Sequence, residues 1–235
     1  MSVRQLRGVI FDMDGVIVDS HAVHRKAWRM FFQTLGREVP ESELDFILDG
    51  RKRGDILRHF LGNCPDPELE ELGRRKDCIF RQMHLEITPV PGVVGMVDAL
   101  HRHGVGLALA TSASPSRAHS TLLKLGLLDY FPVVVTGEDV LLGKPDAAIY
   151  RLACNRLEID PRHVLAVEDA VSGVQAAVSA GLGCVGIASH EAPANLIAAG
   201  AAHIVRDFES VSVHDLESIL QRHRSASQQV AAAGG

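Results

Sequence analysis

The chain has 235 residues, of which 46% are hydrophobic and 23% are charged, and its formal net charge is −5. This length suits one large domain, or a core domain with a smaller insert, and the composition is typical of a globular protein. The acidic balance argues against nucleic acid or an anionic membrane as the partner, because both would require a basic face.

The cysteine pattern indicates free thiols. Cys64, Cys78, Cys154 and Cys184 form no C-x-x-C pair, and no leader sequence precedes them, so we expect a protein of the reducing cytoplasm. No stretch reaches the roughly 18 apolar residues that a membrane span needs. A monomer is the expected state in solution.

Short apolar runs recur along the chain, and each is followed by turn residues and then by a helical pattern. The runs cover residues 8–11, 105–110, 132–135, 163–167, 184–187 and 203–205. The intervening helices are expected over 114–126, 145–157 and 172–181. Apolar strands that alternate with helices predict an α/β fold with a Rossmann-like parallel sheet covered by helices on both faces.

The segment between the first two strands breaks this rhythm. Four helical patterns, over 21–36, 42–48, 54–62 and 67–85, follow one another without a convincing strand. We therefore expect an inserted all-helical cap domain over residues 18–90 and a core domain formed by 1–17 and 91–224. The last residues, 225–235, contain nothing that should pack and are expected to be disordered.

Two carboxylates follow the first strand in "GVIFDMDGVIVDS". Side chains two positions apart in an extended segment point to the same side, so Asp12 and Asp14 should converge where parallel sheets bind ligands. Their repulsion, roughly 4 kcal/mol at an effective dielectric constant near 20, favours a cation between them, and Mg²⁺ suits oxygen ligands. The alternative is a turn in which the two acids only cap backbone amides. A calcium loop is less favoured, because Gly15 comes too early for that pattern.

Three later strand ends supply further groups suited to a phosphate site. Thr111 and Ser112 stand before a helix start, Lys144 precedes a proline-started helix, and Glu168 and Asp169 form a second acidic pair. Each has a structural alternative: a helix cap, a solvated lysine or partners of a helix dipole. Together they indicate one site for metal-assisted phosphoryl transfer.

The four segments "FDMDGVIVD", "LATSAS", "GKPDAAIY" and "VEDAVSGVQAA" resemble the ordered motifs of the haloacid dehalogenase superfamily. The helical insert resembles the cap of its β-phosphoglucomutase-like branch. This resemblance implies that Asp12 is the nucleophile that forms an aspartyl-phosphate, and that Asp14 is the general acid and base. It also implies that Thr111 and Lys144 contact the phosphoryl oxygens.

The metal ligands implied by the resemblance are Asp12, the main-chain carbonyl of Asp14, Asp169, and Glu168 either directly or through water. The cap residues that match the mutase-like pattern are Ser20, His24, Arg53 and Lys76, and with Ser112 they form the expected substrate-binding set. Solvated helix faces are the alternative for the basic runs at 51–53 and 74–76. His24 could instead pack with Trp28 and Phe31 on an apolar stripe.

The leading hypothesis is a Mg²⁺-dependent phosphatase of a small phosphorylated metabolite such as a sugar phosphate. One alternative is β-phosphoglucomutase, which passes the phosphoryl group to a sugar hydroxyl instead of to water. The other is a non-catalytic phosphate-binding protein. The presence of Asp14 favours phosphoryl transfer over dehalogenation, since the resemblance implies that halide-displacing relatives lack this second acid.

Overall fold

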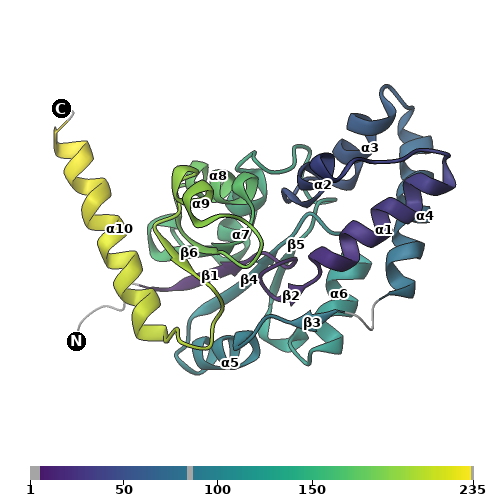
Figure 1. The fold of residues 1–235 in the computed structure, drawn as a ribbon. Coiled ribbons are helices and arrows are strands. Elements are labelled where there is room, and N and C mark those ends of the chain that lie inside the picture. Colours follow the sequence, from purple (N-terminus) through teal and green to yellow (C-terminus); the bar gives the residue numbers. More distant parts are fainter. Residues whose placement is uncertain (1–5, 84–86, 234–235) are drawn as a thin grey trace.

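A parallel sheet forms the centre of the molecule in the computed structural model of the chain, which describes residues 6–83 and 87–233 (Figure 1). In these ranges its six strands run in the order β5-β4-β1-β6-β7-β8, and every pairing is parallel. The strands are β1 (Gly8–Phe11), β4 (Gly106–Ala110), β5 (Val133–Val135), β6 (Val164–Glu168), β7 (Gly183–Ile187) and β8 (His203–Val205). The predicted α/β fold is confirmed.

The register of the central strands brings their carboxyl ends to one level. Phe11 pairs with Leu109 on one side and with Val167 on the other. The residues that follow these strands therefore emerge at the same edge of the sheet, where open α/β sheets hold their ligands.

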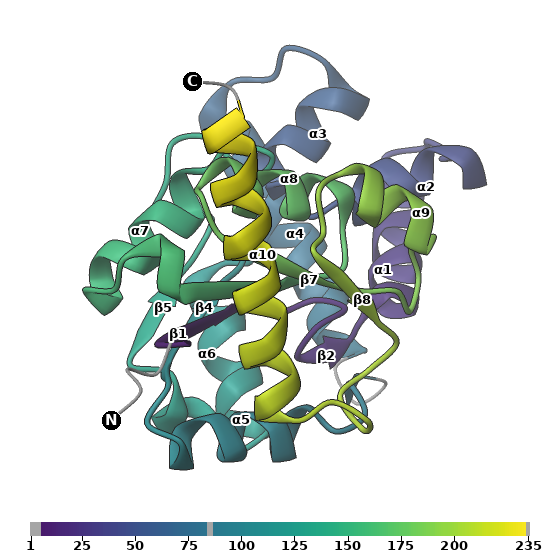
Figure 2. The same ribbon diagram turned by 90° about the vertical axis from the view of Figure 1, so that its left-hand side faces the viewer.

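Helices cover both faces of the sheet (Figure 2). One face packs against α5 (Val93–Arg102), α6 (Pro115–Lys124) and α10 (Val213–Ala233), and the other packs against α7 (Ala148–Leu157), α8 (Val171–Ser179) and α9 (Pro193–Ala198). Short 3₁₀ helices occupy Leu128–Tyr130 and Pro161–His163. No described helix has the length and apolar character that crossing a membrane requires.

The insert forms a separate helical layer with its own apolar core. It contains α1 (His21–Thr34), α2 (Glu41–Leu48), α3 (Arg53–Leu61) and α4 (Asp66–Gln82). Trp28, Phe31 and Phe32 of α1 lie at the centre of this core, with Leu44 and Leu57 packed against them. The end of the last predicted helix, at residues 84 and 85, lies outside the described residues. We keep 18–90 as the proposed extent of the cap and 1–17 with 91–224 as that of the core.

Two features differ from the sequence-based expectation. The links between sheet and cap form a two-residue antiparallel ladder of β2 (Val18–Asp19) and β3 (Thr88–Pro89), which is too short to leave a periodic pattern. The segment expected to be a disordered tail continues α10 as far as Ala233. Its serine, glutamine and alanine residues can extend a helix that Val213, Leu216 and Leu220 already anchor to the sheet.

Candidate active site

Asp12 stands directly after β1 and is joined to a buried lysine. Lys144 Nζ lies 2.6 Å from Asp12 Oδ1 and 2.6 Å from Glu168 Oε1, and all three side chains are at most 9% exposed. Burial raises the pKa of Asp12 well above its usual value, and the charge of Lys144 offsets this only in part. Burial alone would lower the pKa of Lys144, but Asp12 and Glu168 raise it, so the lysine remains an ammonium. The solvated alternative for Lys144 is wrong.

Glu168 ends β6 and is held from several sides. Its Oε1 accepts hydrogen bonds from Lys144 and from the Tyr150 hydroxyl at 2.6 Å, while its Oε2 accepts one from the amide of Asp169 at 3.1 Å. Gly173 of α8 faces this carboxylate so closely that a Cβ there would lie 2.0 Å from Glu168 Oε1. Glu168 is therefore fixed beneath the site as the partner of Lys144.

Asp169 lies between Gly15 and His21. A Cβ on Gly15 would lie 1.8 Å from Asp169 Oδ2, and the φ angle of Gly15 is +79°, so only glycine fits at this turn. His21 Nε2 lies 3.0 Å from the same oxygen, yet Asp169 Oδ2 has no hydrogen bond of acceptable geometry although it is buried. Burial raises the pKa of Asp169, while His21 opposes that rise.

Asp14 is held by a bidentate arginine that the sequence analysis did not single out. Arg117 of α6 donates from Nη1 to Asp14 Oδ1 at 2.7 Å and from Nη2 to Asp14 Oδ2 at 2.6 Å. The Ser20 hydroxyl donates to Asp14 Oδ1 at 2.6 Å, and His24 Nε2 lies 3.2 Å from it. Burial alone would raise the pKa of Asp14, but Arg117 and His24 hold it well below its usual value.

His24 connects Asp14 to Lys76 of α4. Lys76 Nζ lies 3.4 Å from His24 Nδ1, and it sits over the rings of Trp28 and Phe80 at 5.0 and 4.8 Å. Burial and the charge of Lys76 lower the pKa of His24 to about 3, so this histidine is neutral near pH 7. Burial also lowers the pKa of Lys76 to about 8.

The basic runs of the cap behave differently from one another. Lys76 is only 3% exposed, so a solvated helix face is the wrong interpretation for this residue. Arg74 and Arg75 are exposed, and for them the solvated-face interpretation holds. Arg53 is partly exposed and bonds Asp77, next to Lys76.

Thr111 and Ser112 follow β4, and both have structural partners. Thr111 Oγ1 accepts from the amide of Ala113 at 3.1 Å, as a turn cap does, which leaves its hydroxyl proton available. The Ser112 hydroxyl donates to the carbonyl of Gly50 in the cap at 2.6 Å. Ser112 therefore joins the core to the cap.

The cap and the sheet edge enclose a cleft of about 1020 Å³. Of the predicted residues, eight line this cleft: Asp12, Asp14, His24, Arg53, Lys76, Thr111, Ser112 and Asp169. Ser20, Lys144 and Glu168 lie behind this lining and contact it through Asp14 and Asp12. The structure thus brings together all of the sequence-predicted residues.

The acidic groups suit a hard divalent cation. One oxygen from each of Asp12, Glu168 and Asp169 lies within 4.8 Å of the others, all three residues are buried, and Asp169 Oδ2 lacks a hydrogen bond. Mg²⁺ prefers such oxygen donors together with water and phosphate. Because Lys144 and Tyr150 occupy Glu168 Oε1, we propose Asp12 and Asp169 as the side-chain ligands.

Three site residues were missed in the sequence analysis: Arg117, Tyr150 and His21. Arg117 lies in the first turn of α6, where the helix dipole disfavours a positive charge. A cation at this position is therefore a sequence signal that an anionic group lies nearby. Tyr150 ends the quoted motif "GKPDAAIY", and His21 begins the helix expected over 21–36. An apolar helix face accounts equally well for the tyrosine, and a helix start for the histidine. Their contacts with Glu168 and Asp169 depend on the fold.

Comparison with known proteins adds independent findings. A model of the haloacid dehalogenase-like hydrolase family matches residues 6–181. The chain is 33% identical over 189 residues to the phosphorylated carbohydrates phosphatase of Thermotoga maritima, covering 75% of this chain and 82% of that one. It is 29% identical over 192 residues to the beta-phosphoglucomutase of Bacillus subtilis, covering 77% and 83%. A crystal structure of a CbbY variant from Rhodobacter sphaeroides in complex with xylulose-(1,5)-bisphosphate matches with a TM-score of 0.77 and 26% identity, covering 88% and 96%.

Proposed function

Because the chain belongs to the haloacid dehalogenase-like hydrolase family, we propose that it is a Mg²⁺-dependent phosphatase of small phosphorylated metabolites such as sugar phosphates. The observation that carries this proposal is the buried pair of Asp12 and Lys144, with Asp14 and Asp169 opening into the same cleft. A phosphorylated carbohydrates phosphatase among the relatives supports the substrate class.

Asp12 is the proposed nucleophile. Lys144 binds its Oδ1, which leaves Oδ2 to attack phosphorus. A bond forms between this oxygen and phosphorus while the bond from phosphorus to the ester oxygen breaks, so the phosphoryl group moves to Asp12. Covalent catalysis of this kind divides one difficult displacement into two easier ones. We propose that the hydroxyl proton of Thr111, which lines the cleft, stabilises the phosphoryl oxygens, and that the buried ammonium of Lys144 supports them from behind Asp12.

Asp14 is the proposed general acid and base. After it has taken up a proton from solvent, it gives that proton to the departing ester oxygen, and it then takes a proton from the water that attacks the aspartyl-phosphate and releases inorganic phosphate. In the structure, Arg117 keeps Asp14 ionised. We propose that an anionic group of the substrate competes for Arg117, so that the pKa of Asp14 rises when the substrate is bound.

Mg²⁺ would be held by Asp12 and Asp169, and when bound it neutralises the negative charge of the phosphoryl group and of the attacking carboxylate. Glu168 keeps Lys144 charged and in position. We propose that His21, whose Nε2 lies 3.0 Å from Asp169 Oδ2, keeps Asp169 in position as an ion-pair partner.

The cap, together with Arg117 of α6 in the core, supplies the groups that would select the substrate. Arg53, Lys76 and Arg117 are cationic, His24 is neutral, and all four line the cleft. This lining suits a polar, anionic molecule of sugar-phosphate size.

β-Phosphoglucomutase is the second candidate, and Arg53 and Lys76 favour it because a bisphosphorylated intermediate needs a cationic grip on its second phosphate. Incubation with β-glucose 1-phosphate, Mg²⁺ and a trace of the bisphosphate separates the two candidates. Release of inorganic phosphate alone supports the phosphatase, whereas formation of glucose 6-phosphate supports the mutase. A non-catalytic phosphate-binding protein would neither release inorganic phosphate from any sugar phosphate of a test panel nor form glucose 6-phosphate.

A further inference from the structure

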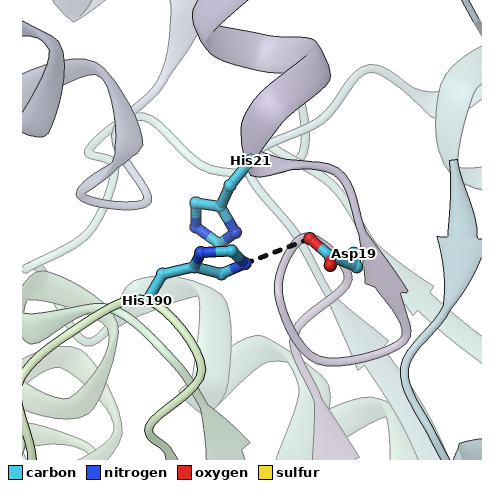
Figure 3. Close-up of side chains that lie close together, drawn as sticks. All are labelled: Asp19, His21 and His190. Atoms are coloured by element: carbon cyan, nitrogen blue, oxygen red, sulfur yellow. Dashed lines mark hydrogen bonds and ion pairs between the residues drawn. The ribbon is translucent and has the colours of Figure 1, made fainter. Parts of the chain in front are cut away.

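A second group of potential metal ligands lies beside the catalytic cluster, where the cap joins the core. Asp19 belongs to β2, His21 is the first residue of α1, and His190 lies between β7 and α9. One nitrogen of each imidazole and one oxygen of Asp19 lie within 4.8 Å of one another. Figure 3 shows the two rings lying one over the other, with the Asp19 carboxylate facing His190.

The contacts within this group are close. His190 Nε2 lies 3.0 Å from Asp19 Oδ1, and the ring centroids of His21 and His190 are 4.1 Å apart with an angle of 40° between the rings. Ligands that each lie about 2.0 to 2.2 Å from a tetrahedral ion are separated by about 3.3 to 3.6 Å, so small side-chain adjustments suffice to place an ion here.

His21 has a buried nitrogen without a partner. Its Nε2 lies 3.0 Å from Asp169 Oδ2, so the nitrogen that Asp169 does not contact is Nδ1. This atom is buried and has no hydrogen-bond partner, and the residue as a whole is only 6% exposed. A metal ion bound to Nδ1, which gives up any proton that it carries to solvent, would provide this atom with a partner without disturbing the contact of His21 with Asp169.

We propose that Asp19, His21 and His190 form a second metal site, which takes Zn²⁺ or a similar transition-metal ion and is separate from the Mg²⁺ site at Asp12 and Asp169. Two imidazoles and one carboxylate are a donor set that Zn²⁺ accepts and that Mg²⁺ does not favour. The side chains of Asp19 and His190 are 50% and 37% exposed, so the ion can enter and keep a water as its fourth ligand. His190 Nε2 loses its proton, if it carries one, to solvent on binding.

The proposed site connects the link into the cap with the core. Asp19 and His21 lie on the link into the cap, whereas His190 belongs to the core. An ion bound by all three joins the link to the core, and its ligand His21 also contacts Asp169.

The test uses untagged full-length protein with Mg²⁺ in large excess, so that the oxygen-ligand site is filled. Calorimetric titration with Zn²⁺ should reveal one equivalent of binding, and titration with Co²⁺ should produce the strong visible absorption of a four- or five-coordinate, nitrogen-ligated ion. In His190→Ala and in Asp19→Asn, the affinity should fall by at least about 100-fold, since even neighbours of metal ligands typically change affinity 10- to 100-fold.

The exposed His119 of α6 provides the matched control. His119→Ala should bind Zn²⁺ as the unmodified chain does, and the Mg²⁺-dependent turnover of His190→Ala should remain unchanged, which shows that the variant is folded. The proposal is overturned if no equivalent of Zn²⁺ binds in excess Mg²⁺, or if binding is undiminished in His190→Ala.

Discussion

Replacing Lys144 with methionine tests the buried charge cluster. The ammonium lies 2.6 Å from an oxygen of Asp12 and 2.6 Å from one of Glu168, and its own side chain is 1% exposed. At an effective dielectric constant of about 20, each contact is worth about 6 kcal/mol before desolvation is counted. Loss of one partner from such a buried group typically costs about 3 to 5 kcal/mol of stability after desolvation. We therefore expect Lys144→Met to lower the free energy of unfolding by about that amount, out of a usual total of about 5 to 15 kcal/mol.

Urea unfolding followed by circular dichroism in EDTA measures this loss, with Lys26→Met on the exposed surface of α1 as the control. The double variant Lys144→Met with Glu168→Gln should be more stable than Lys144→Met alone, because it removes one of the carboxylates left without a counter-charge. A loss below about 1 kcal/mol for Lys144→Met, the value typical of exposed ion pairs, would refute the reasoning.

Four further results are expected. Asp12→Asn should reduce turnover by a factor on the order of 10⁴ or more without loss of the fold, and steady-state kinetics with circular dichroism check this; normal turnover would exclude Asp12 as the nucleophile. The pKa of Lys76 is about 8 in the folded chain, against a usual value of 10.5. Its buried charge therefore lowers the free energy of unfolding below pH 8, and this loss disappears as the pH rises from 8 to 10.5. The kcat/KM of the unmodified chain should accordingly fall above pH 8, whereas Lys76→Arg should lose this decline; an identical profile for the two would show that Lys76 does not serve the substrate. Gly15→Ala should weaken Mg²⁺ activation by at least about 10-fold in a metal titration, because its Cβ would collide with Asp169; an unchanged activation curve would contradict the proposed ligand. Arg117→Met should move the alkaline limb of the kcat/KM profile, which Asp14 governs as the general acid, to higher pH, because the pKa of Asp14 rises when the guanidinium is removed; a shift to lower pH would contradict the pairing.

The sequence predicted the sheet well because its signals are local. Each strand is an apolar run that ends at turn residues, and the groups after the strands converge because all of the strands are parallel. The convergence of Asp12, Lys144 and Asp169 follows from this rule without any knowledge of side-chain positions. The four helices of the cap were also visible, since Trp28 and Phe31 recur at helical spacing and pack in its core.

The parts that were missed depend on contacts between distant segments. Arg117 reaches Asp14 across 103 positions, and no local pattern identifies its partner. The same holds for Ser112, whose hydroxyl was expected to face the substrate but donates to Gly50 of the cap. The helical state of residues 225–233 was missed for another reason: a helix anchored upstream continues through residues that would not nucleate one.

The most direct test of the account is to trap the covalent intermediate. The protein is mixed with a phosphate-labelled sugar phosphate and Mg²⁺, quenched in acid during turnover, and digested for mass spectrometry. The account predicts a phosphoryl group on the peptide that contains Asp12, and no label on the protein in Asp12→Asn. Turnover without any protein-bound label, or a label that maps to another residue, would contradict it.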